Sequence, residues 1–187
     1  GFELSNNPFR ECPSWQEIAD LPIAQRIARL RTGKMRARLL AEPGGSDHQQ
    51  LRTRNWERIF ALGDPPDYEP RPQASIAARA RRDAVEPAAL AYDLMLERDG
   101  RAILYRPTTN YAAGDMAPVY DMLRHPHTLI GLGDGGAHVG VMCDATDATH
   151  ALTHWTRDRT RGPRLSIEHM VARLTRNNAA AMGLTDR

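Results

Sequence analysis

Apolar residues in the first hundred positions recur mainly at helical spacing, and proline or glycine interrupts them at short intervals. Ile23, Ile27 and Leu30 stand at i, i+4 and i+7, which predicts one apolar stripe on a short helix. Ser14 and Glu17 have the spacing of a capping box, which predicts that another helix begins there. Three further short helices are predicted around residues 35–40, 75–82 and 87–98.

Two short apolar runs in the second half have the composition of buried strands. Residues 102–105 form the first run and residues 128–132 the second, while a partly alternating run at residues 54–62 is a further strand candidate. Helices are predicted around residues 116–123 and 147–155, one after each of the two apolar runs. Strands that alternate with helices indicate βαβ units, in which neighbouring strands lie parallel.

The last predicted helix follows Ser166, whose hydroxyl can cap its first turn. Gly183 stands where a glycine commonly ends a helix. Such a helix is expected to cover the core with one apolar face. Four residues are expected to line that face: Ile167, Met170, Val171 and Leu174.

Composition narrows the class of protein. The 187 residues suffice for one domain or slightly more, and 41% of them are hydrophobic, enough for a real core. The net charge is only +2, and even the densest basic run, residues 79–83, ends in an acid, so we expect no nucleic-acid partner. No apolar window approaches the roughly 18 residues of a membrane span, and no signal peptide is recognisable, so no membrane partner is expected either.

Cysteine usage and the chain ends add two expectations. Cys12 and Cys143 are far apart and form neither a disulfide framework nor a metal motif, which favours a reduced, cytoplasmic setting. The chain starts at Gly1 without a methionine and stops at Arg187, so both ends look like cuts in a longer protein.

The sharpest chemical signal follows the second apolar run. Residues 133–138 read Gly-Asp-Gly-Gly-Ala-His, so Asp134 stands at the end of a predicted buried strand, where α/β barrels and open sheets carry their functional residues. A buried carboxylate is costly unless it is paired or bound to metal, and the glycines allow backbone to approach a ligand. An aspartate that only caps the following turn is an equally open alternative.

The seven histidines offer weaker candidates. His125 and His127 look like a metal pair, but a proline separates them and they precede a predicted strand instead of following it. His150 and His154 have the i, i+4 spacing of zinc ligands, but an alanine stands where a metalloprotease carries its glutamate base. His138 shares its loop with the aspartate and could contact substrate.

Residues 128–140, Thr-Leu-Ile-Gly-Leu-Gly-Asp-Gly-Gly-Ala-His-Val-Gly, resemble the eighth-strand motif of the amidohydrolase superfamily. More narrowly, they resemble the N-acyl-D-amino-acid deacylase (D-aminoacylase-like) branch. The closing run at residues 174–184 is similar to the same branch, and these two stretches are the more specific ones. Supporting similarities lie in the same order at residues 55–59, 94–96, 123–126 and 152–155.

The resemblance implies a zinc-dependent hydrolase that cleaves the amide bond of N-acyl (D-)amino acids or related amides. Asp134 would be its catalytic aspartate, which binds or faces the metal and carries the proton of the attacking water. Gly135 and His138 lie in the same loop as Asp134, and we expect them to bind substrate. The implied fold is α/β, the C-terminal part of a (β/α)8 barrel. Residues 1–100 would be a mainly helical insertion or lid region with a short strand, and residues 101–187 the last βα units.

The chain departs from the family pattern in two ways. Gly133 stands where members commonly have serine. The His-x-His of the first strand and the histidines of the fifth and sixth strands are absent and would precede Gly1. A zinc site usually needs three or more protein ligands, so we expect zinc to be bound mainly outside this chain and the polypeptide alone to be inactive.

The expected partners are a small-molecule substrate and the remainder of the barrel or a complementary chain. Unpaired sheet edges of a part-barrel also favour a homo-oligomer. The alternative reading is a catalytically dead remnant that folds as a small α/β binding module. A His-x-His motif upstream of Gly1 would discriminate between the two.

Overall fold

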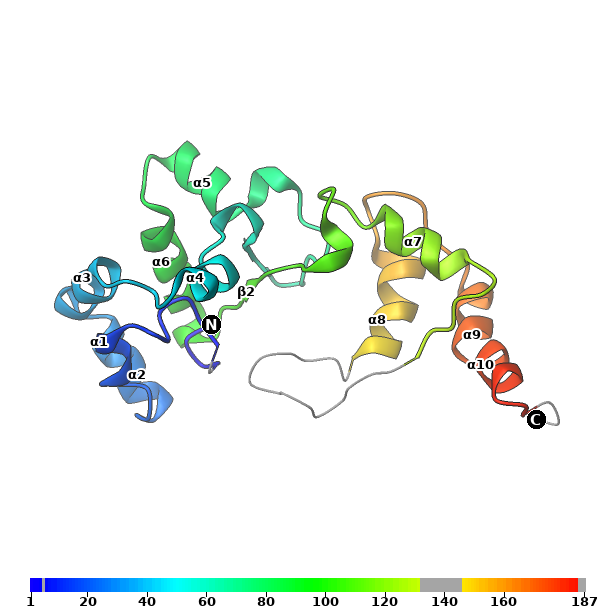
Figure 1. Ribbon diagram of the computed structural model, residues 1–187, viewed down its shortest axis with the longest axis horizontal. Coiled ribbons are helices and arrows are strands. Elements are labelled where there is room, and N and C mark those ends of the chain that lie inside the picture. The colour runs from blue at the N-terminus through cyan, green and yellow to red at the C-terminus, as the bar shows by residue number, and fades with distance from the viewer. Residues whose placement is uncertain (5, 132–145, 185–187) are drawn as a thin grey trace. The chain divides into compact units, whose positions relative to one another are not determined.

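A computed structural model describes residues 1–4, 6–131 and 146–184. The chain divides into two compact units, Gly1–Thr109 and Asn110–Arg187, and the described residues of both are predominantly helical (Figure 1). This boundary concerns packing alone. The assignment of residues 1–100 to an insertion and of residues 101–187 to barrel units stays a prediction.

The first unit is built from short helices and one antiparallel strand pair. Strand β1 (Phe60–Ala61) pairs with β2 (Leu104–Tyr105), with Phe60 opposite Tyr105. The helices of this unit are α1 (Pro13–Gln16), α2 (Ile23–Leu30), α3 (Gly33–Ala41), α4 (Asp47–Thr53), α5 (Ile76–Asp83) and α6 (Pro87–Gly100), with 3-10 turns η1 (Trp56–Arg58) and η2 (Pro72–Ala74).

Aromatic side chains form the centre of the larger core of this unit. Phe2 packs edge-on against Tyr92 of α6, with 5.2 Å between ring centroids, and stacks on Trp15 of α1 at 5.6 Å. Phe9 meets the same tyrosine edge-on at 5.4 Å. The hydroxyl of Tyr92 donates to the Leu30 carbonyl at 2.7 Å, so the end of α2 is joined to α6 inside the core.

A glycine allows α6 to lie close to α2. Gly100 has φ of +82°, and a Cβ atom there would lie 2.2 Å from Cδ1 of Ile27. Only glycine combines the left-handed backbone with this close approach.

The second unit contains four α-helices among its described residues. Residues 147–153 form a helix that runs directly into a π-helical turn, and Trp155 of that turn packs with Ala151, Leu165 and Met170 in a small core. The 3-10 turn η3 (Thr109–Tyr111) lies at the boundary of the units. The other elements are α7 (Ala117–Arg124), α8 (Asp147–Thr153), η4 (His154–Asp158), α9 (Ile167–Leu174) and α10 (Arg176–Ala181).

The predicted helices are largely confirmed. Ser75 and Ser166 cap α5 and α9, since their hydroxyls accept from the amides of Ala78 and His169 at 3.2 and 3.1 Å. Gly183 follows α10 with φ of +73°, as predicted for a helix-ending glycine. The predicted long last helix is instead two helices, because Thr175 leaves helical geometry at φ −122° and ψ −83°.

The predicted capping box at Ser14 is wrong. Helix α1 begins at Pro13, and the amide and hydroxyl of Ser14 both donate to the carboxylate of Glu42. Glu17 instead pairs with Arg38 of α3. Hydrogen bonds to ionised partners are roughly twice as strong as neutral ones, so these long-range contacts replace the local cap.

The predicted parallel strand pair is also not found in the described residues. Residues 104–105 pair antiparallel with residues 60–61, which are the strand within the run 54–62. Residues 128–131, the described part of the second predicted strand, are irregular. A strand needs a neighbour for its backbone groups, and side chains of α9 and α10 hold the carbonyls of Thr128 and Ile130 instead.

One predicted apolar face is partly wrong. Met170 is fully buried and Leu174 is half-buried, as predicted, but Ile167 and Val171 are exposed at 49% and 45%. The core of the second unit therefore contacts only part of the predicted apolar face.

No helix in the described part of the chain has the length and apolar character needed to cross a membrane.

Candidate functional site

The predicted site residues Asp134, Gly135 and His138 fall within residues 132–145, outside the residues that the structure describes. The elements on either side are described. Residues 125–131 lead toward the site from α7, and α8 begins at Asp147 after it.

Residues 125–131, the segment that leads from α7 toward the predicted site, are hydrogen-bonded to side chains of the last two helices. Arg173 of α9 is 4% exposed, and its Nη2 donates to the carbonyl of His125 at 2.8 Å and to that of Thr128. The side-chain amide of Asn178 in α10 donates to the carbonyl of Ile130 at 2.6 Å. Three backbone carbonyls of residues 125–131 therefore accept hydrogen bonds from two side chains that lie 45 to 48 positions later in the sequence.

Two histidines lie on α8 and its continuation. The rings of His150 and His154 stack at 4.8 Å between centroids, with an interplanar angle of 12°. Burial and, as the smaller cause, the neighbouring charge of His154 together lower the pKa of His150 to about 4. His150 is therefore an uncharged imidazole at neutral pH.

The geometry of these two rings does not suit a metal site. A metal binds in the plane of an imidazole, and the planes of two nearly parallel, stacked rings do not meet at a nearby point. His125 and His127 are exposed, and the backbone amide of His127 donates to Nδ1 of His125 at 3.3 Å. Over residues 1–4, 6–131 and 146–184, no group of three or more His, Cys, Asp or Glu side chains could hold a metal ion.

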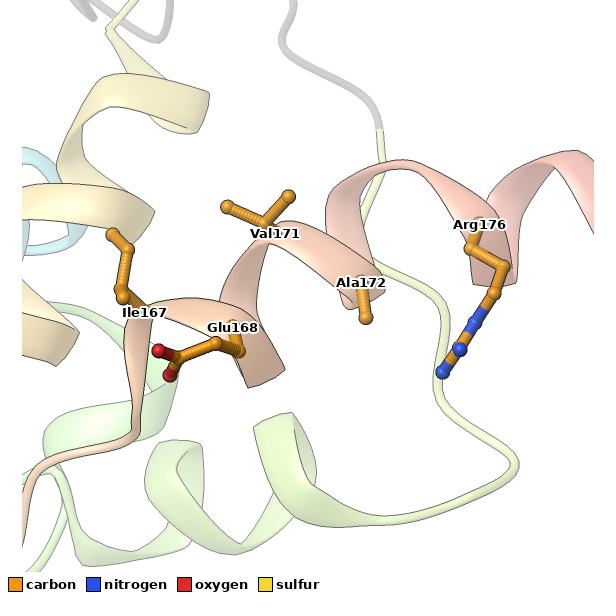
Figure 2. Close-up of a pocket in the computed structure, with 5 residues that line it drawn as sticks. All are labelled: Ile167, Glu168, Val171, Ala172 and Arg176. Carbon is orange, nitrogen blue, oxygen red and sulfur yellow. The ribbon is translucent and has the colours of Figure 1, made fainter.

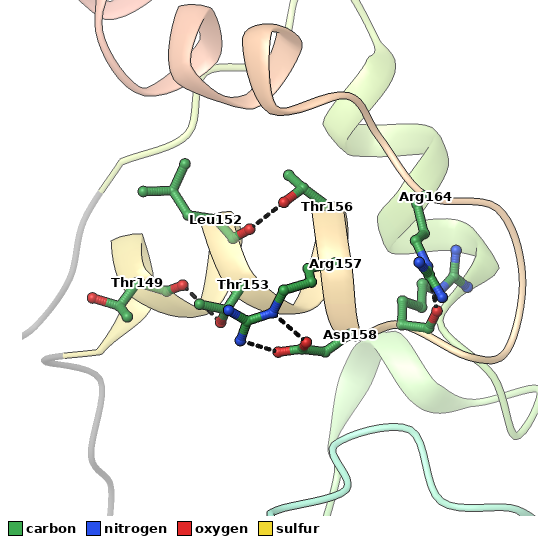
Figure 3. Close-up of polar contacts among 8 residues, drawn as sticks. Thr149, Leu152, Thr153, Thr156, Arg157, Asp158 and Arg164 are labelled. Carbon is green, nitrogen blue, oxygen red and sulfur yellow. Dashed lines mark hydrogen bonds and ion pairs between the residues drawn. The ribbon is translucent and has the colours of Figure 1, made fainter.

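Side-chain hydrogen bonds stabilise the π-helical turn that follows α8 (Figure 3). Thr153 and Thr156 donate to carbonyls one turn back, those of Thr149 and Leu152, at 2.9 and 2.5 Å. Asp158 accepts two hydrogen bonds from the Arg157 guanidinium, which lowers the pKa of the Asp158 carboxyl.

The loop after this turn is built around a buried arginine, Arg159. The guanidinium of Arg159 lies 4.8 Å from the ring centroid of Trp155 and 5.5 Å from that of Tyr120. Its Nη1 donates to the carbonyl of Pro163 at 2.9 Å, and a Cβ on Gly162 would lie only 2.9 Å from Nη2. This arginine therefore stabilises the loop and is not presented to solvent.

A surface hollow of about 410 Å³ lies along α9 and the start of α10 (Figure 2). Its wall is mainly apolar, with one carboxylate and one guanidinium at its border. The lining residues are Ile167, Glu168, Val171, Ala172 and Arg176.

The sequence profile described as "Amidohydrolase family" matches residues 3–187, almost the entire chain. The chain belongs to the amidohydrolase family. The amidohydrolase superfamily resemblance is thereby confirmed. Neither the comparison with curated proteins nor that with solved structures gave a match.

Membership in the amidohydrolase family indicates a hydrolase whose family fold is a (β/α)8 barrel. Members of the amidohydrolase family generally use metal ions. The described residues of this amidohydrolase segment form a helix-rich α/β structure, which is compatible with part of a barrel.

Sequence reasoning did not single out Arg173 and Asn178. The sequence does contain an indication for Arg173, because it stands three positions after the buried Met170 and therefore shares its helical face. Asn178 lies inside the closing run that resembles the family. The partners of both residues lie too far away in the sequence to be identified by spacing.

Proposed function

We propose that this chain supplies the catalytic aspartate, Asp134, of a zinc-dependent amidohydrolase that hydrolyses N-acyl-D-amino acids or related amides. One observation carries the proposal: the family match over residues 3–187 includes the string Gly-Asp-Gly-Gly-Ala-His at residues 133–138. This string and the closing run at residues 174–184 resemble the N-acyl-D-amino-acid deacylase branch.

In the proposed reaction, the carboxylate of Asp134 is the general base and then the general acid. It accepts a proton from the water whose oxygen attacks the amide carbonyl carbon, and it passes that proton to the nitrogen as the C–N bond breaks. The products are a carboxylate and a free amino acid. His138 and Gly135, in the same stretch of sequence, are proposed to contact the substrate.

Zinc, when bound, polarises the carbonyl and makes the attacking water more acidic. The described residues do not fit a zinc site, because no group of three potential ligands is found among them. We therefore propose that most zinc ligands come from outside these residues. The partners in this proposal are the small-molecule substrate and the rest of the barrel.

We further propose a cytoplasmic location. Cys12 is a free thiol buried in the core of the first unit, and burial raises its pKa, so it is protonated and inert at neutral pH. A buried unpaired thiol is compatible with a reducing compartment.

The test uses the complete gene product. Release of the free amino acid from N-acetyl-D-amino acids is measured after metal removal and after addition of zinc, with the L enantiomers as the specificity control. Asp134→Asn is expected to lower kcat by about 100- to 10,000-fold, as for loss of a general acid–base group. The matched control is Asp147→Asn in the first turn of α8, which should leave kcat nearly unchanged.

Three outcomes would count against the proposal. An Asp134→Asn variant that keeps most of its activity would remove Asp134 from proton transfer. Equal hydrolysis of both enantiomers would remove the D-aminoacylase branch and leave the amidohydrolase family in place. A complete protein without any amidase activity or zinc would favour the alternative of a small α/β binding module.

A further inference from the structure

We propose that one surface on α9 and the start of α10, the α9 face, joins two copies of this chain in an antiparallel dimer. The α9 face consists of Ile167, Glu168, Val171, Ala172 and Arg176. The inference is independent of the proposed function, because it involves neither a catalytic residue nor a metal. It places the contact between copies on a helix, whereas the expectation from the sequence was association through unpaired sheet edges.

The centre of the α9 face is apolar and open to solvent. Ile167 and Val171 are exposed at 49% and 45%, while Met170 on the same helix is fully buried. The two exposed side chains stand four positions apart, so they lie on one side of the helix and together line the hollow of about 410 Å³. Association would remove this apolar surface from water, which is favourable.

Two opposite charges border this apolar centre. Figure 2 shows Glu168 near the start of α9 and Arg176 beyond its end, with Val171 and Ala172 between them. Both charged residues are exposed, and neither has an ion-pair partner in the part of the chain that the structure describes. A partner with charge of a single sign would be attracted at one end and repelled at the other. The α9 face therefore suits a partner that carries the same two charges in reverse order.

A second copy of the chain meets this requirement. In a two-fold dimer both copies use the same surface, so a contact from one residue to another is always matched by the reverse contact. Ala172 stands four positions from both Glu168 and Arg176. With the two-fold axis at Ala172, Glu168 of each copy lies opposite Arg176 of the other, and two equivalent ion pairs flank the apolar centre. The small alanine at the crossing point allows the helix axes to approach to about 8 Å.

The size of the α9 face predicts a weak dimer. Interfaces that bury about 1,600 Å² have dissociation constants from micromolar to picomolar. The α9 face spans only residues 167–176, so we expect a smaller contact and a dissociation constant in the micromolar range. The dilute protein is then a monomer with Val171 open to solvent.

The test measures the mass of the complete gene product by sedimentation equilibrium, from low to high micromolar protein concentration. We expect a reversible equilibrium between monomer and dimer that shifts toward monomer as salt is added, because salt screens exposed ion pairs. Glu168→Arg and Arg176→Glu each bring like charges together across the axis. Each should raise the dissociation constant by about 10- to 100-fold. The matched controls Glu86→Arg and Arg71→Glu reverse exposed charges in the first unit and should leave it unchanged.

Two combinations of variants test the antiparallel arrangement. The double variant, Glu168→Arg with Arg176→Glu, again has opposite charges in both pairs, so its dissociation constant should return close to the wild-type value. An equimolar mixture of the two single variants should form a mixed dimer, because one copy then carries two arginines and the other two glutamates. Contacts within one chain cannot produce recovery in the mixture, and such recovery also shows that both single variants are folded.

Four results would overturn the inference. The first is a wild-type protein that stays monomeric through the high micromolar range. The second is a pair of single variants that associate as well as the controls. The third is association that neither the double variant nor the mixture recovers, because the two charges then do not face each other. The fourth is loss of helix content in both single variants by circular dichroism, because the α9 face is then an internal contact. None of these results depends on hydrolase activity, so the proposed function is tested separately.

Discussion

Ser14 donates both its backbone amide and its hydroxyl to the carboxylate of Glu42, with 2.9 Å from the amide nitrogen to Oε2. Ser14 is fully buried, and Glu42 follows the last residue of α3, so the contact joins α1 to the end of α3. We predict that Glu42→Gln lowers the free energy of unfolding by about 1–3 kcal/mol, because one buried donor loses its charged acceptor. Urea denaturation measures the change.

The control for this prediction is Glu86→Gln at the exposed N-terminus of α6, where the side chain makes no capping hydrogen bond. A surface change of this kind should stay within about 0.5 kcal/mol. If Glu42→Gln falls in the same range, the carboxylate does not stabilise the start of α1.

Arg159 is expected to be a stabilising residue of the second unit. Arg159→Lys keeps the charge but loses the flat surface that lies between Trp155 and Tyr120 and shortens the reach to Pro163. We predict that the free energy of unfolding falls by about 2–3 kcal/mol, which urea denaturation measures.

Arg157→Lys is the matched control, because Arg157 is exposed and pairs with Asp158 on the surface. Exposed ion pairs contribute about 0–1 kcal/mol, so the control should remain near the wild type. Equal losses for the two variants would contradict a specific role for the buried guanidinium.

His150 should make the second unit less stable in acid. Its pKa is lowered to about 4 in the folded chain by burial and by His154, from about 6.5 in the unfolded chain. Between these values the unfolded state binds more protons, so stability is fully present above pH 6.5 and is lost as the pH falls toward 4. With allowance for solvent screening at a half-buried ring, the loss between pH 7 and pH 5 is about 1–2 kcal/mol.

The measurement compares urea denaturation at pH 7 and pH 5. His150→Gln removes the titrating group, so its loss of stability between the two pH values should be smaller than that of the wild type by about 1–2 kcal/mol. His127→Gln, on an exposed side chain, should lose as much as the wild type. A His150→Gln variant with wild-type pH dependence would show that burial of this imidazole is not linked to folding.

The sequence predicted those features that neighbouring residues determine. Helices α2 and α6 follow from apolar spacing, and α5 and α9 from the caps at Ser75 and Ser166, which need only a hydroxyl three positions before the amide that donates to it. These interactions form between residues within one helical turn of each other, so the spacing of neighbouring residues is enough to predict them.

Features that depend on distant partners could not be predicted in this way. Glu42 displaces the expected cap at Ser14 from 28 positions away, and β1 lies more than forty positions before β2, its antiparallel partner. The residues in and around the candidate site show the same difference between local and long-range features. Asp134 was identified by resemblance to a family motif, whereas Arg173 and Asn178 emerge only from contacts to carbonyls 45 to 48 positions earlier.

Helix α9 allows a direct test of where the predicted face and the observed face differ. Both Met170 and Val171 were expected to point inward, but Met170 is fully buried and Val171 is 45% exposed beside a surface hollow (Figure 2). We predict that Met170→Ala costs about 2–5 kcal/mol, through lost burial and the cavity that remains. Val171→Ala should change stability by no more than about 0.5 kcal/mol, as a surface substitution does.

Urea denaturation of the two variants under one condition, with helix content followed by circular dichroism, measures the difference. The two positions are adjacent on one helix and alanine favours helix in both, so propensity cannot account for a large gap between them. A loss at Val171→Ala as large as that at Met170→Ala would show that the complete protein covers this face of α9. The exposed hollow would then be an internal contact of the folded protein.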